Sequence, residues 1–274
     1  MKTMILTLMI ALLSVVPHAQ AFDHEHSAFT VLLKKHVLLI EGGKASQVRY
    51  ACFVQDRSAL KSYRDSLTQV SAAEYSGWSK AQQMAFLINA YNAFTIEKIL
   101  TRYPDIQSIW DFGKLFGNPF KDRFFKLLGQ DFSLDMIEHE TLRKPGNFNE
   151  PRVHFAVNCA SIGCPMLREE AYAASRLDAQ LEEQTRRFLS DSSRNRYNPR
   201  NGGIEVSEIF KWFKEDWTSG YRGLGGKQQP MKSREQFFAR YADLMATDPA
   251  HREAIRSQKA DIRFLDYDWR LNRN

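Results

Sequence analysis

The strongest structural signal in the sequence is a long apolar helix predicted over residues 80–102. Ser79 and Gln82 have the spacing of a capping box at its start, and a proline soon after residue 102 stops it. Asn89 and Asn92 lie three residues apart and therefore share one face of this helix. Asparagine is unfavourable inside a helix, and a buried amide needs hydrogen-bond partners. The two amides predict either a structural tie to neighbouring loops or a polar group in a functional site.

The rest of the chain mixes helices and strands without a regular alternation, so we predict an α+β fold. We expect a single domain with a small mixed or antiparallel sheet surrounded by several helices. Further helices are expected at residues 27–39, 56–70, 133–143, 175–190, 207–217, 233–245 and 248–258, and strands at 47–54, 124–128, 153–157, 204–206 and 262–267. The C-terminal residues are aromatic and polar, and we expect them to dock on the domain.

The beginning of the chain has the composition of a secretory signal. Lys2 supplies the positive charge, an uncharged apolar run follows, and residues 19–21 have the small-x-small pattern of a cleavage site. The run is shorter than the roughly 20 residues that a membrane-spanning helix needs. We therefore predict a signal at 1–21, an N-terminal extension at 22–70 packed on the domain, and the main domain at 71–274. The protein is expected to be exported, periplasmic or secreted, without a membrane span after cleavage. An uncleaved interfacial anchor is the alternative.

The charge of the chain does not point to a particular partner. The formal net charge is +6, but acidic residues are interleaved with the basic ones. Solubility explains this balance better than attraction to an anionic surface. No nucleic-acid recognition motif is present, so we expect no nucleic-acid partner. The residue patterns predict no cofactor.

Three cysteines, Cys52, Cys159 and Cys164, bear on the chemistry. An oxidising compartment would allow one disulfide and leave one thiol over. Cys159 follows the predicted strand 153–157, and small residues and a glycine come after it, which suits a fixed and approachable nucleophile. A Cys159–Cys164 disulfide that staples this loop is an equally supported alternative. The spacing is not Cys-x-x-Cys, so we do not expect a thioredoxin-like redox site, and a structural zinc site is not expected either.

Two histidines are candidates to act with Cys159. His139 lies on the predicted helix 133–143, with Asp135 and Arg143 one turn away on either side. A nearby imidazolium would lower the pKa of a thiol. His154 alternates with apolar neighbours in the predicted strand and so lies on the face opposite them. A surface or purely structural role is the alternative for His139.

These motifs occur in a recognisable order. They are Asn-Ala-Tyr-Asn-Ala at 89–93, Ile-Glu-His at 137–139 with Leu142-Arg143, His-Phe-Ala-Val-Asn-Cys-Ala-Ser at 154–161, and Tyr-Asp-Trp-Arg-Leu-Asn at 267–272. The set resembles the domain-of-unknown-function family 547, which occurs in bacteria and, in diverged form, in plants. The resemblance covers residues 71–272, and it implies one continuous domain but no established activity. Plant-type members resemble this chain at His139 and Cys159 but lack a cysteine matching Cys164. This implies a role for Cys159 beyond a disulfide. A histidine matching His154 is less general in the family.

We predict a cysteine-dependent hydrolase or acyl-transfer enzyme with a peptide, amide or thioester substrate. Cys159 is the predicted nucleophile and His139 the predicted base. Asn89, Asn92 or Asp268 would orient the imidazole. Backbone amides at 161–163 would stabilise the oxyanion. The predicted binding residues are Tyr91, Arg143, His154, Ser161, Trp269 and Asn272. A non-enzymatic binding or scaffold domain with a structural Asn, His and Cys cluster is the alternative.

The predicted cleavage also has a consequence for metal binding. It would leave Phe22-Asp23-His24 at the amino terminus, and a free amine, two amides and a third-position imidazole suit Cu(II) or Ni(II). Chance occurrence explains this motif better, so no metal site is predicted. Copper or nickel handling through His24 would depend on the position of the mature amino terminus.

Overall fold

The computed structural model describes residues 21–113, 117–222, 224–226 and 230–274. The predicted signal sequence lies outside these residues, apart from Ala21. Within the described part of the chain, no helix is both long enough and apolar enough to cross a membrane.

The fold is α+β in a single domain, as predicted. The helices are α1 (Ser27–His36), α2 (Tyr50–Gln55), α3 (Arg57–Gln69), α4 (Ala72–Ser76), α5 (Lys80–Leu100), α6 (Leu177–Leu189), α7 (Ile209–Trp212), α8 (Arg234–Arg240), α9 (Ala242–Met245) and α10 (Pro249–Arg256). The strands are β1 (Val37–Ile40), β2 (Ala45–Val48), β3 (Phe125–Leu127), β4 (Gln130–Phe132), β5 (Asn195–Asn198), β6 (Gly203–Ser207) and β7 (Ile262–Leu265). They form three small sheets: two antiparallel hairpins, β1–β2 and β3–β4, and a mixed sheet in which β6 pairs antiparallel with β5 and parallel with β7.

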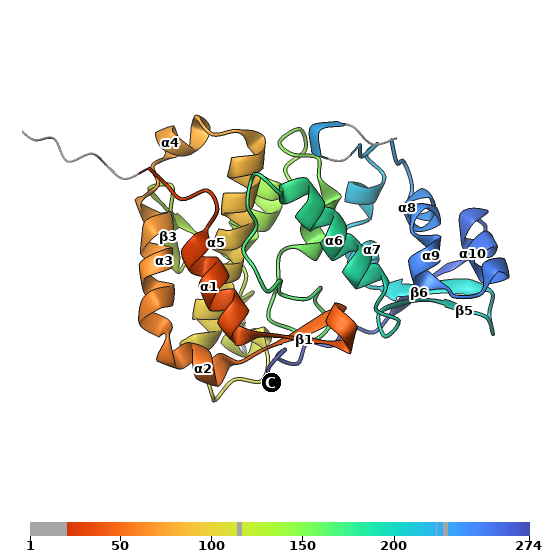
Figure 1. Cartoon of the computed structure of the whole chain (residues 1–274), viewed down its shortest axis with the longest axis horizontal. Coiled ribbons are helices and arrows are strands. Elements are labelled where there is room, and N and C mark those ends of the chain that lie inside the picture. Colours follow the sequence, from red (N-terminus) through yellow and green to blue (C-terminus); the bar gives the residue numbers. More distant parts are fainter. Residues whose placement is uncertain (1–20, 114–116, 223, 227–229) are drawn as a thin grey trace, which may run out of the picture.

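Helix α5 is the centre of the N-terminal half of the molecule (Figure 1). Its capping box is present as predicted, with the Gln82 N–H donating to Ser79 Oγ. Every residue from Gln83 to Leu100 is buried, because a helix that is apolar on all sides has to be covered on all sides. Helices α1 and α3 pack in the same core. A second, strongly aromatic core lies around β6, α7 and α8 at the other end of the molecule.

The C-terminal segment joins the two halves, which confirms that it docks on the domain. It runs from β7 back to the N-terminal half, so the C-terminus lies near β1 and α2 in Figure 1. The Asn272 N–H donates to Ala160 O at 3.0 Å, and the Val48 N–H donates to Asn272 O at 2.8 Å. Leu271 and Asn272 are both buried. The segment therefore touches β2 and the loop that carries Cys159.

Two predicted strands are wrong in part or in full. Strand β2 ends at Val48, and α2 begins at Tyr50, because Tyr50 and Phe53 are buried at helical spacing. The predicted strand 153–157 is a 3₁₀ helix, Pro151–Phe155, that begins with a proline and is capped by Glu150. All five of its residues are buried, so buried and exposed positions do not alternate along this segment. Without such a periodicity, the sequence pattern cannot distinguish a strand from a helix.

The predicted helix 133–143 is a π-helix over Met136–Leu142. The Arg143 N–H donates to Glu138 O at 2.9 Å, five residues back, and Ser133 Oγ accepts from the Met136 N–H. π-helices are rare and often occur at functional sites. Here the wider turn carries Glu138 and His139.

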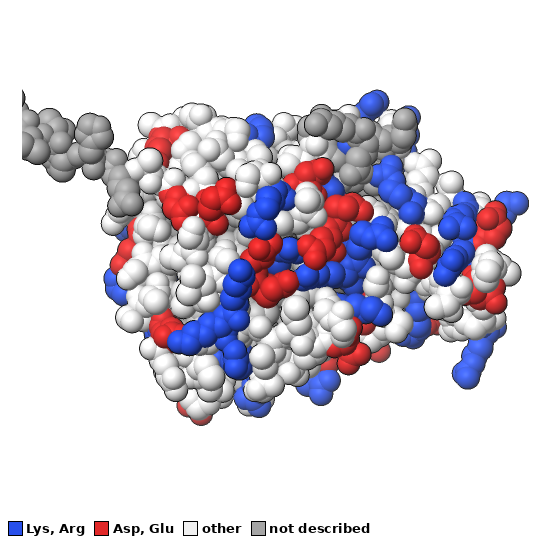
Figure 2. Space-filling view, viewed as in Figure 1, with Lys and Arg blue, Asp and Glu red and all other residues white. Residues whose placement is uncertain are grey.

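Charged side chains of both signs gather over α6 (Figure 2). Arg168 and Arg187 each pair with Glu183, at 2.6 and 2.7 Å, and Arg187 also pairs with Glu169. On this face the positive and negative charges are thus interleaved rather than separated into patches.

Candidate functional site

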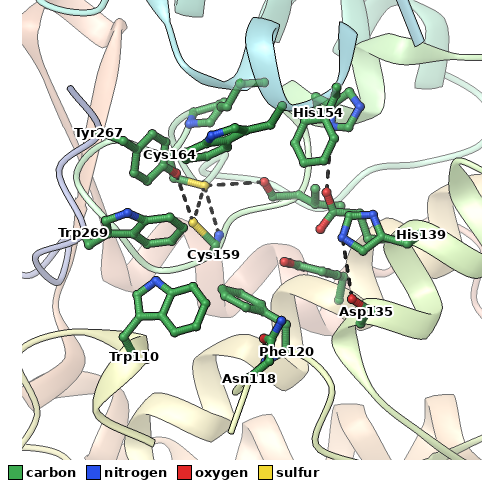
Figure 3. Close-up of a pocket in the computed structure, with 17 residues that line it drawn as sticks. Trp110, Asn118, Phe120, Asp135, His139, His154, Cys159, Cys164, Tyr267 and Trp269 are labelled. Atoms are coloured by element: carbon green, nitrogen blue, oxygen red, sulfur yellow. Dashed lines mark hydrogen bonds and ion pairs between the residues drawn. The ribbon is translucent and has the colours of Figure 1, made fainter. Parts of the chain in front are cut away.

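A cavity of about 320 Å³ lies between α5, the π-helix, the loop 156–165 and the C-terminal segment. Cys159 and His139 lie on different sides of it (Figure 3). Seven of its 17 lining residues are Phe, Tyr or Trp, namely Tyr91, Trp110, Phe120, Trp212, Phe213, Tyr267 and Trp269. An apolar cavity with a few convergent polar groups is the usual form of a small-molecule site.

Cys159 and Cys164 meet at the wall of this cavity. Both are free thiols, and their Sγ atoms are 3.0 Å apart although four residues separate them in sequence. Cys159 is half-buried, whereas Cys164 is 6 % exposed. Cys52, the third cysteine, belongs to α2 and is not among the residues that line this cavity.

The surroundings of Cys159 favour its thiolate. Burial raises the pKa of this thiol, but hydrogen bonds from Cys164, Ser161 and Tyr267 lower the pKa by more than burial raises it. The pKa of Cys159 therefore lies below the ordinary value. Ser161 Oγ is 3.0 Å and Tyr267 Oη 3.2 Å from the sulfur. Burial and the charge of Cys159 raise the pKa of Cys164 well above its usual range. The predicted imidazolium is therefore not what acidifies Cys159; hydroxyl groups and the second thiol do.

Asn92 and Asn158 hold the loop that carries Cys159. The Asn92 amide donates to Ala156 O at 3.0 Å and accepts from the Asn158 N–H at 2.8 Å. Asn158 Oδ1 in turn accepts from the Ala160 N–H and from the Asn272 amide. Asn92 and Asn272 therefore position the backbone on either side of the nucleophile.

Asn89 makes the equivalent pair of bonds farther along α5. Its amide donates to Tyr172 O at 2.7 Å and accepts from the Tyr172 N–H at 2.9 Å. Both helix asparagines are thus structural ties to neighbouring loops, the first of the two alternatives. Neither orients a histidine, which corrects that prediction for Asn89 and Asn92.

Two of the three predicted oxyanion amides, those of Ile162 and Gly163, are already occupied. The Ile162 N–H donates to Arg270 O and the Gly163 N–H to Asp268 O, each at 2.8 Å. A Cβ at Gly163 would meet Asp268 N at 2.9 Å, so only glycine fits this contact. The Asp268 carboxylate pairs with Arg270 and is not among the cavity-lining residues. Asp268 therefore does not orient His139.

His139 lines the cavity but does not contact Cys159. Arg143 donates to its Nδ1 at 2.6 Å, and because arginine only donates, that nitrogen is an acceptor and the ring proton is on Nε2. Nε2 lies 3.7 Å from Asp135 Oδ1. Among the described residues no hydrogen bond joins His139 to Cys159. In this structure His139 is therefore not hydrogen-bonded to the thiol that we predicted it to deprotonate.

His154, Glu138 and Asp216 form a polar chain at the cavity wall. His154 Nε2 is 2.7 Å from Asp216 Oδ2, and His154 Nδ1 is 3.8 Å from Glu138 Oε1. Burial raises the pKa of Glu138, although its neighbours His139 and Arg143 oppose this. The pKa of Asp216 is about 2, because the hydrogen bonds from His154 and Arg143 outweigh burial. An ionised Asp216, a histidine and a carboxyl with a raised pKa thus follow one another toward the cavity.

The binding residues that we predicted lie at or around this site. Tyr91, His154 and Trp269 line the cavity, and Glu138 shares a hydrogen bond with Tyr91. Ser161 contacts the Cys159 sulfur, and Arg143 links His139 to Asp216. Asn272 supports the loop from behind.

Three residues of the site were missed from the sequence: Glu138, Asp216 and Tyr267. Glu138 and Tyr267 are polar residues of the Ile-Glu-His and Tyr-Asp-Trp motifs, so their place in these motifs was a signal for both. Asp216 lies in an aromatic stretch with no local sign of a role.

Within the described ranges, no group of three or more His, Cys, Asp and Glu side chains is arranged to hold a metal ion. His24 packs edge-on against Trp78, with ring centroids 4.5 Å apart.

Comparison with known proteins identifies a family for this site. No curated protein and no solved structure matches the chain. Residues 75–189 match the family model described as "Protein of unknown function, DUF547". The match runs from before α5 to the end of α6 and so includes Glu138, His154, Cys159 and Cys164, while Tyr267 comes from outside it. This segment of the chain is therefore similar to the DUF547 family.

Proposed function

We propose that this protein is an exported, cysteine-dependent hydrolase or acyl-transfer enzyme that acts on amide or thioester bonds. The observation that carries the proposal is the Cys159 sulfur, which lines an apolar cavity and lies within hydrogen-bond distance of two hydroxyl groups and a thiol. The thiolate is the nucleophilic form of cysteine, and these contacts lower the pKa of the Cys159 thiol.

The first chemical step forms a bond between Cys159 Sγ and the substrate carbonyl carbon. The sulfur loses its negative charge in this step, and the carbonyl oxygen gains it. Ser161 Oγ and Tyr267 Oη are 3.2 Å apart and both face the sulfur. Because the hydroxyl groups rotate, they can turn from the sulfur to the new oxyanion, and they replace the occupied backbone amides in this role.

The second step requires a proton for the leaving amine or thiolate. Glu138 lines the same cavity, and burial raises the pKa of its carboxyl, which favours the protonated form. It acts as the general acid, and His154 with Asp216 behind it stabilises the carboxylate that remains. In the hydrolytic half-reaction the same carboxylate takes a proton from water, which attacks the thioester on Cys159.

The tryptophans of the cavity favour an apolar acyl group. Trp212 stacks on Trp269 with centroids 5.8 Å apart, and Trp110 meets Trp269 edge-on at 5.4 Å. Trp110 and Trp212 are 39 % and 40 % exposed, which is unusual for such large apolar side chains. Exposed aromatic surface beside a cavity marks a ligand-binding site.

The test is acylation of the purified mature protein by a benzoyl thioester, with an acetyl thioester for comparison and with intact-mass and peptide mapping as readouts. We expect an acyl group on Cys159, faster with benzoyl than with acetyl, and its slow loss to water. Cys159→Ala abolishes the adduct, Glu138→Gln slows turnover, and Cys52→Ala is the matched control without effect. Failure of thioesters and amides alike to label Cys159 would overturn the proposal. Ligand binding that persists without turnover, unchanged in Cys159→Ala, would instead support a non-enzymatic binding domain.

Export is tested separately. After expression of the full chain in a bacterium, we expect the protein in the periplasmic fraction with Phe22 as its first residue, because the small-x-small pattern ends at Ala21. An intact amino terminus in the cytoplasmic fraction would contradict this expectation.

A further inference from the structure

We propose that Cys159 and Cys164 together also carry out thiol–disulfide exchange, with Cys159 as the attacking thiol and Cys164 as the resolving thiol. The substrate class is a small or peptide disulfide with apolar groups beside the sulfurs. This activity goes beyond acyl transfer, which makes no use of a second sulfur as a nucleophile. It also revises the expectation drawn from the cysteine spacing, because the fold brings the two sulfurs within 3.0 Å of each other.

The first argument is the position of Cys164. Its Sγ lies 3.0 Å from Cys159 Sγ and accepts the Cys159 backbone N–H at 3.0 Å. Both cysteines line the cavity, but Cys159 is partly exposed, whereas Cys164 is only 6 % exposed. A substrate disulfide therefore meets Cys159 first, and the second sulfur is already in place behind it.

The second argument is that distant parts of the chain hold this arrangement. The loop between the cysteines pairs with the C-terminal segment, where Ser161 lies opposite Leu271 in an antiparallel bridge. At Gly163 the loop passes so close to the Tyr267 ring that an added Cβ would lie 3.0 Å from it. Ala160 adopts a φ of 63°, in the left-handed region, where the loop reverses direction. The approach of the two sulfurs is therefore imposed by tertiary packing and not by a flexible loop.

The third argument is the electrostatic difference between the two thiols. The pKa of Cys159 is lowered and that of Cys164 is raised, in part because of the negative charge on Cys159. Attack on a disulfide removes this charge, because the Cys159 sulfur becomes neutral. The pKa of Cys164 then falls, so the resolving thiol loses its proton more readily once the mixed disulfide exists.

The reaction balances as two exchanges. The Cys159 thiolate attacks the substrate disulfide, an S–S bond to Cys159 forms, and the first substrate sulfur leaves as a thiolate. Cys164 then attacks the Cys159 sulfur, its proton passes to the second leaving thiolate, and a Cys159–Cys164 disulfide forms. The substrate disulfide is reduced by two electrons, and the protein dithiol is oxidised. A small dithiol such as dithiothreitol returns the protein to its starting state.

The test uses the aromatic disulfide dithiobis(nitrobenzoate) on the reduced mature protein carrying Cys52→Ser, which removes the third thiol. We expect rapid release of two thionitrobenzoate ions per protein, no retained adduct, and a mass lower by two hydrogen atoms. Adding Cys164→Ser stops the reaction at one ion, with one adduct on Cys159. Cys164→Ala, which leaves no polar group in the buried position, must trap the same adduct, so the outcome does not depend on one variant folding. Adding Cys159→Ser in place of a Cys164 change slows the first release at least tenfold.

The proposal is overturned if the Cys52→Ser protein keeps adducts on both cysteines, or if the Cys164 variants release a second ion. The assay contains no acyl substrate, so its result is independent of the acylation experiment. Two-ion release without acylation removes only the proposed acyl transfer, and acylation without two-ion release removes only the exchange.

Discussion

Replacing Asn92 by alanine removes two hydrogen bonds that hold the loop bearing Cys159. The Ala156 carbonyl and the Asn158 N–H, at 3.0 and 2.8 Å from the amide, would lose their partner in the core. A buried polar group left without a partner costs about 1–3 kcal/mol, so the pair costs about 2–6 kcal/mol. That is a large part of the roughly 5–15 kcal/mol that stabilises a typical domain.

Asn89 provides a matched control on the same helix. It makes the same two kinds of bond, to both backbone groups of Tyr172, and is equally buried. We therefore expect Asn89→Ala to lose a similar amount of stability. Only Asn92 holds the loop of Cys159, so only Asn92→Ala should also change the reactivity of that thiol.

Two measurements separate these effects. Urea unfolding followed by circular dichroism gives the free energy of unfolding for each variant. The rate of alkylation by iodoacetamide at Cys159, followed by peptide mapping in native buffer, reports the loop geometry. A loss below about 1 kcal/mol in Asn92→Ala would refute the assignment of these bonds as buried and necessary. Equal changes of alkylation rate in both variants would refute the link between Asn92 and the site.

Three further predictions concern protonation. Tyr267→Phe removes a hydrogen-bond donor to the Cys159 thiolate, and such a bond is worth roughly 1.5–3 kcal/mol. The midpoint of the pH profile of Cys159 alkylation should therefore rise by about one to two pH units. An unchanged midpoint would refute the role of the Tyr267 hydroxyl in lowering the pKa of Cys159. Glu138 has a raised pKa in the folded state. The stability that its protonated form confers is therefore present below pH 4.5, the ordinary pKa, and is lost as pH rises through the raised pKa. Glu138→Gln should remove this loss in urea unfolding measured across that pH range. Burial lowers the pKa of His26 from 6.5 to about 3, so the stability that depends on its neutral form is complete above pH 6.5 and is lost as pH falls toward 3. His26→Gln should reduce the slope of unfolding free energy against pH in this window by up to about 1.4 kcal/mol per pH unit, and equal slopes would contradict the buried neutral imidazole.

Local signals in the sequence were sufficient for the helices with distinctive ends and for the α+β class. The capping box at Ser79 and the apolar character of α5 predicted a buried helix, which the structure confirms. The same reasoning failed at residues 153–157, because a stretch that is buried on every side has no period. The wider π turn that carries Glu138 and His139 also had no local signature.

From the sequence alone we predicted Cys159 as a site residue, two asparagines on one face of an apolar helix, and a C-terminal segment that docks on the domain. These predictions were possible because spacing and composition report on local structure and burial. Only the tertiary structure decided which groups meet the sulfur. Tyr267 is 108 residues from Cys159 in the chain, and it reaches the thiol because the C-terminal segment pairs with the cysteine loop. The pKa of a thiol depends on atoms within a few ångströms, and the distance along the chain does not specify which atoms those are. For that reason His139, the nearest candidate by motif, proved not to be the partner, whereas Tyr267, Ser161 and Cys164 are.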